Sequence, residues 1–588
     1  MSRKSLLITI AAITLTFSFL LPSSATCSEP LEYGPYNEQY FFYYIFWIPC
    51  KTAGDQGIAV KVLYPKQPRY EDGAPIAIFV AGGVKPGFLG FYSPDFNPYG
   101  MIWITFIFPG GRQVVNLPDY GEVVVNSGGT YDYRGNACFQ ALKAVIDFAS
   151  GKIANTAGKK ISDYVSYPVL TDNIGLYGSS YGGVTAILTL LKYGSELSNV
   201  KYVVFYESPA TNFLTTTDLG RVGSDPDPEV DADGDGLPWN DFKNPNYQAE
   251  TCNETWCYIN FSTLRYDAAL GFYLDNNGNG QLDYVGEPPL VSTDIDDSGA
   301  IESDEDFLLS YWSVVINGVE RKAYSYLVTK AADELGLMSD VPEGVLRLDE
   351  AYDFWYMRDM GFHYNEIAEN VSWIKVMQLG FLKEHMCPAP DYPNIVINYN
   401  AFKKRGFWIR LNPDKAYLDN VTGRDVDWQD NDANIEINFD NIRDHVISDP
   451  ILNGAERKLI EVASMLEMAD RVYHNDWSAN LDVVLTQAKP SIEEEVTEIP
   501  ENVWVNIGPD GGDNYFVFVT SKHTVIAATA NSAFRSTDGA ATWSRITEEN
   551  LIDIGFTAMA EVDGVLYAGV GVGRGLMVSY GDGYSWSK

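Results

Sequence analysis

The pattern of apolar and polar positions alternates between two kinds of segment from about residue 57 onward. Short apolar runs bounded by Gly and Pro predict strands, whereas apolar residues at helical spacing predict a helix. The predicted strands are residues 57–64, 75–80, 101–108, 173–177 and 200–206, and the predicted helices are residues 138–150 and 183–193. Strands that alternate with helices predict a mostly parallel sheet covered on both faces.

Further along the chain this rhythm stops and then returns. Residues 213–310 are rich in Asp, Asn and Gly, and the pattern of residues 317–372 predicts aromatic-rich helices. The alternation resumes at residues 373–379, 394–398 and 407–411, and a long amphipathic helix is predicted over about residues 452–472. We therefore predict one α/β domain over residues 26–487 that carries two insertions, the second of them a helical lid.

The C-terminal part has a different composition. Residues 488–502 hold an acidic run between two prolines, which is typical of a linker. Residues 503–588 contain short strand-like segments, many glycines and repeated tryptophans, so we predict a separate all-β domain there.

The charge balance excludes some classes of partner. Acidic residues number 79 and basic residues 41, which gives a formal net charge of −38. Phosphate binding needs a basic surface, so the balance argues against nucleic acid and against docking on anionic lipid. It fits a well-solvated acidic surface or a protein that holds cations.

The first residues predict export. Arg3 and Lys4 precede an apolar run over residues 5–21, and small residues end at Ala25. This is the pattern of a signal peptide over residues 1–25, which predicts a secreted, cell-surface or periplasmic protein without a stable membrane span after cleavage. A retained membrane anchor is the alternative, although the run is slightly short for a span. Six cysteines remain, enough for three disulfides, and Cys252 and Cys257 are close enough to pair.

The sharpest motif is a G-x-S-x-G sequence centred on Ser180, between the predicted strand 173–177 and the predicted helix 183–193. A serine in such a strand–turn–helix context is held with its hydroxyl exposed at the sheet edge. A glycine-rich connection without chemistry is the alternative interpretation. The motif predicts that Ser180 is a nucleophile.

At this motif the chain resembles the α/β-hydrolase family, over about residues 55–485 with the insertion set aside. A glycine pair, Gly82 and Gly83, ends an early strand where the family places its oxyanion loop. The resemblance implies that backbone N–H groups of this loop and of Tyr181 bind the oxyanion. Residues 131–135, which precede the helix before the motif, are similar to a structural turn of the family.

The resemblance also implies a catalytic triad in the order Ser, acid, His. Glu384 follows a late strand at the family's acid position, although the family more often carries Asp there. His445 is the preferred base. The alternatives are that His474 is the base or that none of these histidines belongs to a triad. In such a triad the histidine accepts the serine proton and the carboxylate holds its tautomer.

Three acidic loops in the first insertion follow the spacing of the EF-hand calcium loop. Residues 294–305 fit at every key position. Residues 275–283 form a partial loop, which lacks an acid at the twelfth position because Glu287 comes one residue late. A third loop starts at Asp231. The predicted Ca²⁺ ligands are Asp294, Asp296, Ser298, Ala300, Glu302 and Glu305; Asp275, Asn277, Asn279, Gln281 and Asp283; and Asp231, Asp233, Asp235 and Asp241. A merely solvated acidic loop explains the composition but not the spacing.

Two C-terminal segments, residues 536–543 and 579–586, resemble the Asp-box of β-propellers and start 43 residues apart. The resemblance implies a hairpin repeat without chemistry, and two blades do not close a propeller. We therefore expect part of a longer propeller, which offers a surface for an extracellular protein or glycan partner.

Two functions fit these features. The first is a secreted serine hydrolase of ester or peptide bonds in a small substrate, with Ser180, His445 and Glu384 as its triad and a calcium-stabilised insertion. The second is a non-catalytic extracellular binding or adhesion protein that uses the same domains as binding modules.

Overall fold

The computed structural model describes most of residues 31–479 and parts of residues 514–579. The first stretch has gaps at 84, 91–92, 94–95, 212–215, 220–242, 249–250, 252–257, 289, 340–343, 383–390, 430 and 454–455. The described C-terminal segments are 514–529, 533–537, 544–546, 556–562, 564–570 and 575–579.

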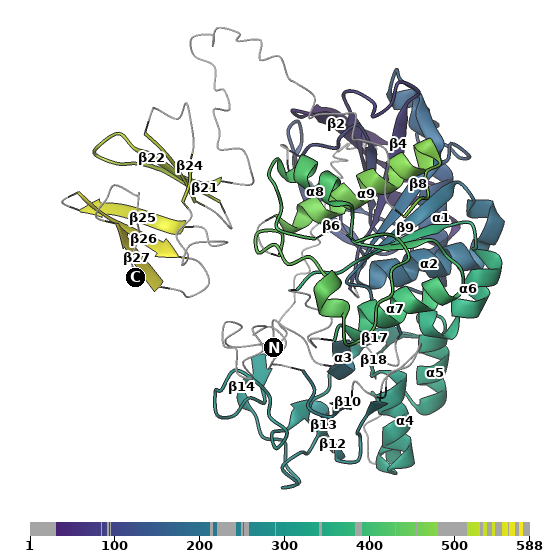
Figure 1. Ribbon diagram of the computed structural model, residues 1–588, viewed down its shortest axis with the longest axis vertical. Coiled ribbons are helices and arrows are strands. Elements are labelled where there is room, and N and C mark those ends of the chain that lie inside the picture. The colour runs from purple at the N-terminus through teal and green to yellow at the C-terminus, as the bar shows by residue number, and fades with distance from the viewer. Residues whose placement is uncertain are drawn as a thin grey trace, which may run out of the picture.

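A nine-stranded sheet forms the centre of the α/β domain (Figure 1). In sheet order its strands are β1 (Glu32–Asn37), β2 (Phe41–Ile48), β3 (Ile58–Pro65), β5 (Ile102–Phe106), β4 (Ala74–Val80), β8 (Val169–Ser179), β9 (Val200–Tyr206), β19 (Lys375–Leu379) and β20 (Ile409–Leu411). The pairs from β5 to β20 are parallel, and the pairs among β1, β2, β3 and β5 are antiparallel. The predicted mostly parallel sheet is therefore confirmed.

Two hydrophobic cores cover the two faces of this sheet. Successive side chains of a strand point to opposite faces, and in β4 Ile76 and Ile78 enter one core while Ala77 and Phe79 enter the other. The first core includes helices α1 (Asn136–Ala149), α2 (Tyr181–Tyr193) and α7 (Pro393–Lys404), and the second includes α8 (Lys415–Thr422) and α9 (Arg457–His474). Burial on both faces explains why these strands are continuous apolar runs.

Buried ion pairs fasten helix α9 to the rest of the domain. The Asp470 carboxylate accepts hydrogen bonds from the Arg69 guanidinium at 2.5 Å and from the hydroxyls of Tyr70 and Tyr417 at 2.6 and 2.7 Å. Because every carboxylate oxygen has a donor, the charge of Asp470 is compensated inside the fold.

Part of the insertion between β9 and β19 packs around a smaller core, which includes Leu264, Phe272, Leu274 and Phe307. Val314, Trp355 and Tyr364 of the same insertion belong to the first core of the sheet. The strands of the insertion are β10 (Tyr247–Gln248), β11 (Tyr258–Ile259), β12 (Leu264–Asp267), β13 (Gly271–Leu274), β14 (Val285–Glu287), β15 (Leu290–Ser292), β16 (Phe307–Leu308), β17 (Trp312–Ile316) and β18 (Val319–Ala323). Its helices are α3 (Thr216–Leu219), α4 (Tyr326–Glu334), α5 (Leu348–Tyr356) and α6 (Tyr364–Asn370).

Short antiparallel sheets make up the remaining described parts. A hairpin of β6 (Arg112–Leu117) and β7 (Gly121–Asn126) precedes α1. The C-terminal strands form one sheet of β21 (Asn514–Val519), β22 (Val525–Thr529), β23 (Ala533–Ser536) and β24 (Ser544–Arg545), and another of β25 (Phe556–Val562), β26 (Val565–Val570) and β27 (Gly575–Ser579). These segments are all β as predicted, whereas most residues of both Asp-box-like motifs lie outside the described residues, so the propeller stays a prediction.

Several details differ from the expectations. Residues 394–398 continue the rhythm as part of helix α7, not as a strand, and the tyrosine-rich strands β1 and β2 precede the first strand that the pattern predicted. Cys50 and Cys138 are buried and free, so a set of three disulfides that uses all six cysteines is wrong. Within the described residues, no helix is long and apolar enough to cross a membrane.

Candidate functional site

Ser180 stands at a strained turn between strand β8 and helix α2. Its φ of 50° and ψ of −127° lie in a region that residues with a side chain rarely adopt. The neighbouring glycines make the turn possible: a Cβ on Gly182 would lie 1.9 Å from the Val80 carbonyl oxygen, and one on Gly178 would lie 2.2 Å from the Gly183 Cα. The glycines of the G-x-S-x-G motif are thus required by close approach of the backbone, as the sequence indicated.

The position of this turn in the sheet also favours a functional role. Strands β4 and β8 are neighbours in the sheet. From β4 the chain continues to β5 on one side of this pair, and from β8 it continues to β9 on the other side. Ligands of open α/β sheets bind in the crevice outside the carboxyl ends of strands at such a switch point. Ser180 follows β8 and Gly82 follows β4, so both lie at this crevice.

The loop after β4 runs directly beside Ser180, since a Cβ on Gly82 would lie 2.8 Å from the Ser180 Cβ. Buried Arg134 holds this loop by donating to the carbonyl oxygens of Gly82 at 2.7 Å and Gly83 at 3.1 Å. In a trans peptide the carbonyl and the following N–H point in opposite directions, so the Gly83 N–H is aimed away from Arg134. The sequence marked the turn that contains Arg134 but missed this role.

Side chains of the insertion cover the start of helix α2. The Trp312 ring of strand β17 lies 4.5 Å from the Tyr181 ring in an edge-to-face arrangement, and the Trp355 ring of α5 lies 6.4 Å away. The residue that follows Ser180 is therefore packed against elements that the insertion supplies.

His445 ends a short 3-10 helix, η8 (Ile442–His445), and is gripped by buried Asn431. The Asn431 Nδ2 donates to the His445 carbonyl oxygen at 2.8 Å, and its Oδ1 lies 2.9 Å from His445 Nδ1. A carbonyl oxygen only accepts, so the amide nitrogen must face it and the amide oxygen must face Nδ1. Nδ1 is therefore the donor in this contact, so in the neutral imidazole the lone pair that a general base needs is on Nε2.

A chain of contacts along the carboxyl edge of the sheet connects the histidine segment with the serine. Ile447 pairs with Phe381, which follows β19, and the Phe381 ring lies 5.4 Å from the Tyr206 ring at the end of β9. The Tyr206 carbonyl oxygen in turn accepts the Ser180 N–H at 2.6 Å. Ser180 and the segment that carries His445 thus belong to the same edge.

Of the other sequence candidates for the triad, the structure describes only His474. Glu384 and His385 lie outside the described residues, so the predicted acid stays a prediction. His474 ends helix α9 between Tyr473 and Asn475, which line a hollow of about 620 Å³ together with Leu170 and Lys201 at the starts of β8 and β9. That hollow is at the amino edge of the sheet. We place the candidate site at the opposite edge, because ligands of such sheets bind at the carboxyl ends of strands.

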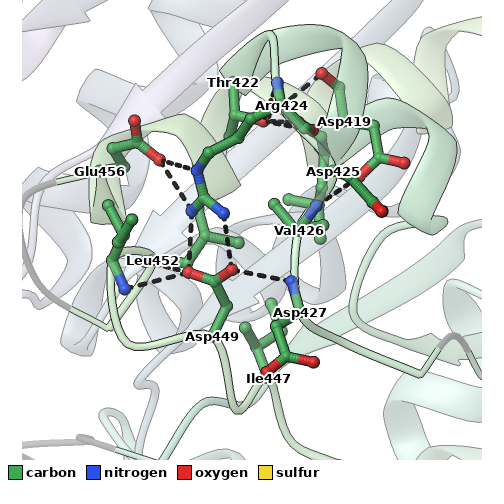
Figure 2. Close-up of polar contacts among 12 residues, drawn as sticks. Asp419, Thr422, Arg424, Asp425, Val426, Asp427, Ile447, Asp449, Leu452 and Glu456 are labelled. Atoms are coloured by element: carbon green, nitrogen blue, oxygen red, sulfur yellow. Dashed lines mark hydrogen bonds and ion pairs between the residues drawn. The ribbon is translucent and has the colours of Figure 1, made fainter.

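A polar clamp holds the loops on both sides of His445 (Figure 2). The buried Asp449 carboxylate accepts both terminal nitrogens of Arg424 at 2.7 and 2.8 Å, and the backbone N–H groups of Asp427 and Leu452 at 2.9 and 3.0 Å. Burial disfavours the charged form, but these donors outweigh it and hold the pKa of Asp449 well below its usual range. The clamp joins the segment that leads to Asn431 with the segment that follows His445.

A second ion pair connects the residue after strand β9 with helix α9. Glu207 follows β9 with a φ of 48° and is buried, and it pairs with Arg457 of helix α9. The Arg457 guanidinium also lies 4.0 Å from the centre of the Phe381 ring, and burial lowers the pKa of Arg457. The sequence did not indicate Glu207 or Arg457, because no local pattern around either residue predicts that the two pair.

The loop 294–305 folds as a cage of oxygen atoms. Oxygens of Asp294, Asp296 and Glu305 lie within 4.8 Å of one another. Burial and the neighbouring Glu302 raise the pKa of Glu305 to about 7, which reflects the crowding of negative charge. Carboxylate, hydroxyl and carbonyl oxygens are the ligands that Ca²⁺ prefers, so the residues present fit that ion. The loop that begins at Asp231 lies outside the described residues.

No protein-family model and no curated protein sequence matches this chain. Among solved structures, prolyl oligopeptidase B from Galerina marginata is 16% identical over 29% of this chain and 22% of its own, with a TM-score of 0.19. A Pyrobaculum calidifontis esterase is 17% identical over 30% of this chain and 48% of its own, with a TM-score of 0.20. Oligopeptidase B from Leishmania major is 16% identical over 29% of this chain and 21% of its own, with a TM-score of 0.20. These similarities are low, span less than half of each of those chains, and assign no activity.

Proposed function

We propose that this protein is a serine hydrolase that cleaves ester or peptide bonds. The observation that carries the proposal is the strained Ser180 turn at the switch point of the sheet, on the same edge as a histidine whose Nδ1 is held by Asn431. A serine with no catalytic role does not need this backbone strain, since an unstrained connection would serve the fold equally well.

In the proposed reaction the Ser180 Oγ attacks the carbonyl carbon of the substrate while His445 Nε2 accepts its proton. The backbone N–H groups of Gly83 and Tyr181 hold the negative charge that develops on the carbonyl oxygen, and Arg134 fixes the Gly82–Gly83 peptide for this task. The protonated His445 then gives its proton to the leaving alcohol or amine. In the second half of the reaction water attacks the acyl-enzyme while His445 Nε2 accepts its proton. His445 then returns this proton to Ser180 Oγ as the acid product leaves, which restores the serine hydroxyl.

Two groups compete for the role of orienting His445. Glu384 is the acid that the sequence resemblance implies, and Asn431 bonds Nδ1 in the described structure. A neutral amide fixes the tautomer as a carboxylate does, but it stabilises the imidazolium less. We propose Asn431 as a positioning residue for His445 and retain Glu384 as the predicted acid, because substitution of each distinguishes them.

We further propose that Ca²⁺ stabilises the insertion, bound by the loop 294–305 and by the loop 231–241. Without a cation the clustered carboxylates repel, so binding is coupled to ordering of this region. Because Trp312 of the insertion packs on Tyr181, an ordered insertion supports the wall beside Ser180. Export through residues 1–25 and a partner surface on residues 503–588 belong to the same proposal.

A fluorophosphonate probe tests the hydrolase proposal, because it reacts with activated serines. We expect the calcium-loaded wild-type protein to be labelled and Ser180→Ala to lose the label completely. Ser179→Ala is the matched control, since it removes a hydroxyl one residue away and should keep the label. Absence of labelling in folded wild-type protein would contradict the proposal and favour the binding-module function.

A further inference from the structure

The partial loop that begins at Asp275 lacks an acidic residue at its own twelfth position, which is Gly286, and Glu287 is exposed. The register of the insertion provides a different candidate. Strands β13 and β16 pair antiparallel with Leu274 opposite Phe307. The residues just beyond this pair, Asp275 and Asp306, are therefore brought together across the ladder.

The hydrogen bonds of Asp306 repeat those of a twelfth-position carboxylate. In the loop 294–305, Glu305 accepts the N–H of the second residue, Ile295, at 2.7 Å and of the ninth, Glu302, at 3.1 Å. In the partial loop, Asp306 accepts the N–H of the second residue, Asn276, at 3.1 Å and of the ninth, Asp283, at 2.8 Å. Asp306 thus occupies the place of the missing acid, although it comes from outside the loop.

A buried oxygen independently points to a ligand at this place. Asp275 is 2% exposed, and its Oδ1 is buried without a hydrogen-bond partner. The nearest cationic group, Arg265, lies 3.7 Å from the other oxygen, Oδ2, which also accepts the Gly280 N–H at 3.1 Å. A buried carboxylate oxygen without a donor is costly, and a bound cation removes that cost.

The neighbouring carboxylates increase the negative charge around this oxygen. Asp306 is fully buried, lies next to the buried Asp275 across the strand pair, and accepts the backbone N–H of Asp283. Two buried carboxylates placed opposite each other favour a divalent cation between them over either group alone.

We propose that Asp306 completes a second Ca²⁺ site in the partial loop, as an acidic ligand supplied from outside it. The other ligands are Asp275, Asn277, Asn279, the carbonyl oxygen of Gln281, and Asp283. Because Asp306 directly follows Glu305, the two loops share one short segment, and binding in either loop favours order in the other. The site is tested by counting bound ions and not by hydrolase activity, so its failure and the failure of that proposal are distinguishable.

Calcium titration calorimetry on the full-length, chelator-stripped protein tests the site. We expect Asp306→Asn to bind fewer ions per chain than the wild type. Asp304→Asn, an exposed neighbour in the same segment, is the matched control and should bind as many ions as the wild type. The double variant N277A/N279A changes two exposed ligands of the partial loop without touching the buried pair, and should bind one ion fewer.

The ion counts of these variants decide whether the proposed site exists. The proposal is overturned if Asp306→Asn binds as many ions as the wild type with unchanged affinity, whatever the double variant does. It is equally overturned if the folded double variant loses no ion. A melting temperature in the presence of chelator that matches the wild type shows that each variant is folded before its ions are counted.

Discussion

Ser180 and His445 lie on the same edge of the sheet but are positioned in different ways. Ser180 is fixed by its immediate neighbours, because Gly178 and Gly182 admit backbone from β4 and α2 at distances that no Cβ tolerates. His445 is fixed by side chains from other loops, chiefly Asn431 and the Arg424–Asp449 pair. A nucleophile set by local geometry is visible as a motif, whereas a base set by distant polar groups is not.

The largest expected effect separates the two chemical roles. His445→Ala removes the proton acceptor, so we expect kcat/KM for an activated ester to fall at least about a thousandfold. The matched control is His474→Ala at the opposite edge, which should leave kcat/KM within about twofold of the wild type. Equal losses in the two variants would contradict the assignment of the base.

A glycine substitution tests whether the close backbone approach at neighbouring glycines positions Ser180. Gly182→Ala places a Cβ 1.9 Å from the Val80 carbonyl oxygen, so we expect the free energy of unfolding to drop by about 3 kcal/mol. Gly344→Ala is the control, because no atom lies within 4 Å of its added Cβ. Chemical denaturation followed by tryptophan fluorescence measures both, and a stable Gly182→Ala protein would show that the turn is less tight than described.

Substitution of Asn431 tests whether side chains from other loops position His445. Asn431→Ala frees the imidazole to rotate, and we expect kcat to fall by about a hundredfold with KM little changed. In Asn431→Asp a carboxylate at Nδ1 stabilises the imidazolium form of His445. Because the base works only when neutral, the acid limb of the pH–rate profile should then move to higher pH. If Glu384→Gln produced the loss and Asn431→Ala did not, Glu384 would be the orienting group.

The Asp449 clamp predicts a pH-dependent contribution to stability. The pKa of Asp449 is depressed in the folded protein. Its contribution to stability is therefore fully present above the unfolded pKa of about 3.9, and it is lost progressively as pH falls from there through the lower folded pKa. We expect Asp449→Asn to cost about 2 kcal/mol at pH 7. The difference in melting temperature between variant and wild type should stay constant down to about pH 4 and narrow steadily below it, as followed by thermal melting from pH 7 to about pH 2. A difference of the same size at both ends of this range would exclude the charge as its cause.

Removal of calcium gives the smallest expected effect on the site itself. With chelator we expect proteolysis within residues 213–310 to be about tenfold faster, because the loops open locally. Labelling of Ser180 should slow by a smaller factor, since Trp312 loses part of its support. Cleavage that is equally fast with and without Ca²⁺ would argue that these loops fold without a cation.

The sequence predicted what depends on short stretches of chain. The parallel sheet, the strand–turn–helix around Ser180 and the loop 294–305 follow from local patterns of apolar residues, glycines and acids. Asn431, Arg134 and Asp306 were missed, because each acts on a residue far from it in the chain or across a strand pair. Strands β1 and β2 were missed because their aromatic runs precede the first clear alternation. Long-range register and polar pairing are properties of the folded chain that no single segment encodes.

The central claim is that Ser180 is a nucleophile activated by His445. Intact-mass spectrometry after fluorophosphonate treatment, followed by peptide mapping, tests it most directly. We expect one adduct per chain on Ser180, formed by the wild type and by His474→Ala but not by His445→Ala. Adducts on other residues, or an adduct on Ser180 that forms equally fast in His445→Ala, would contradict it.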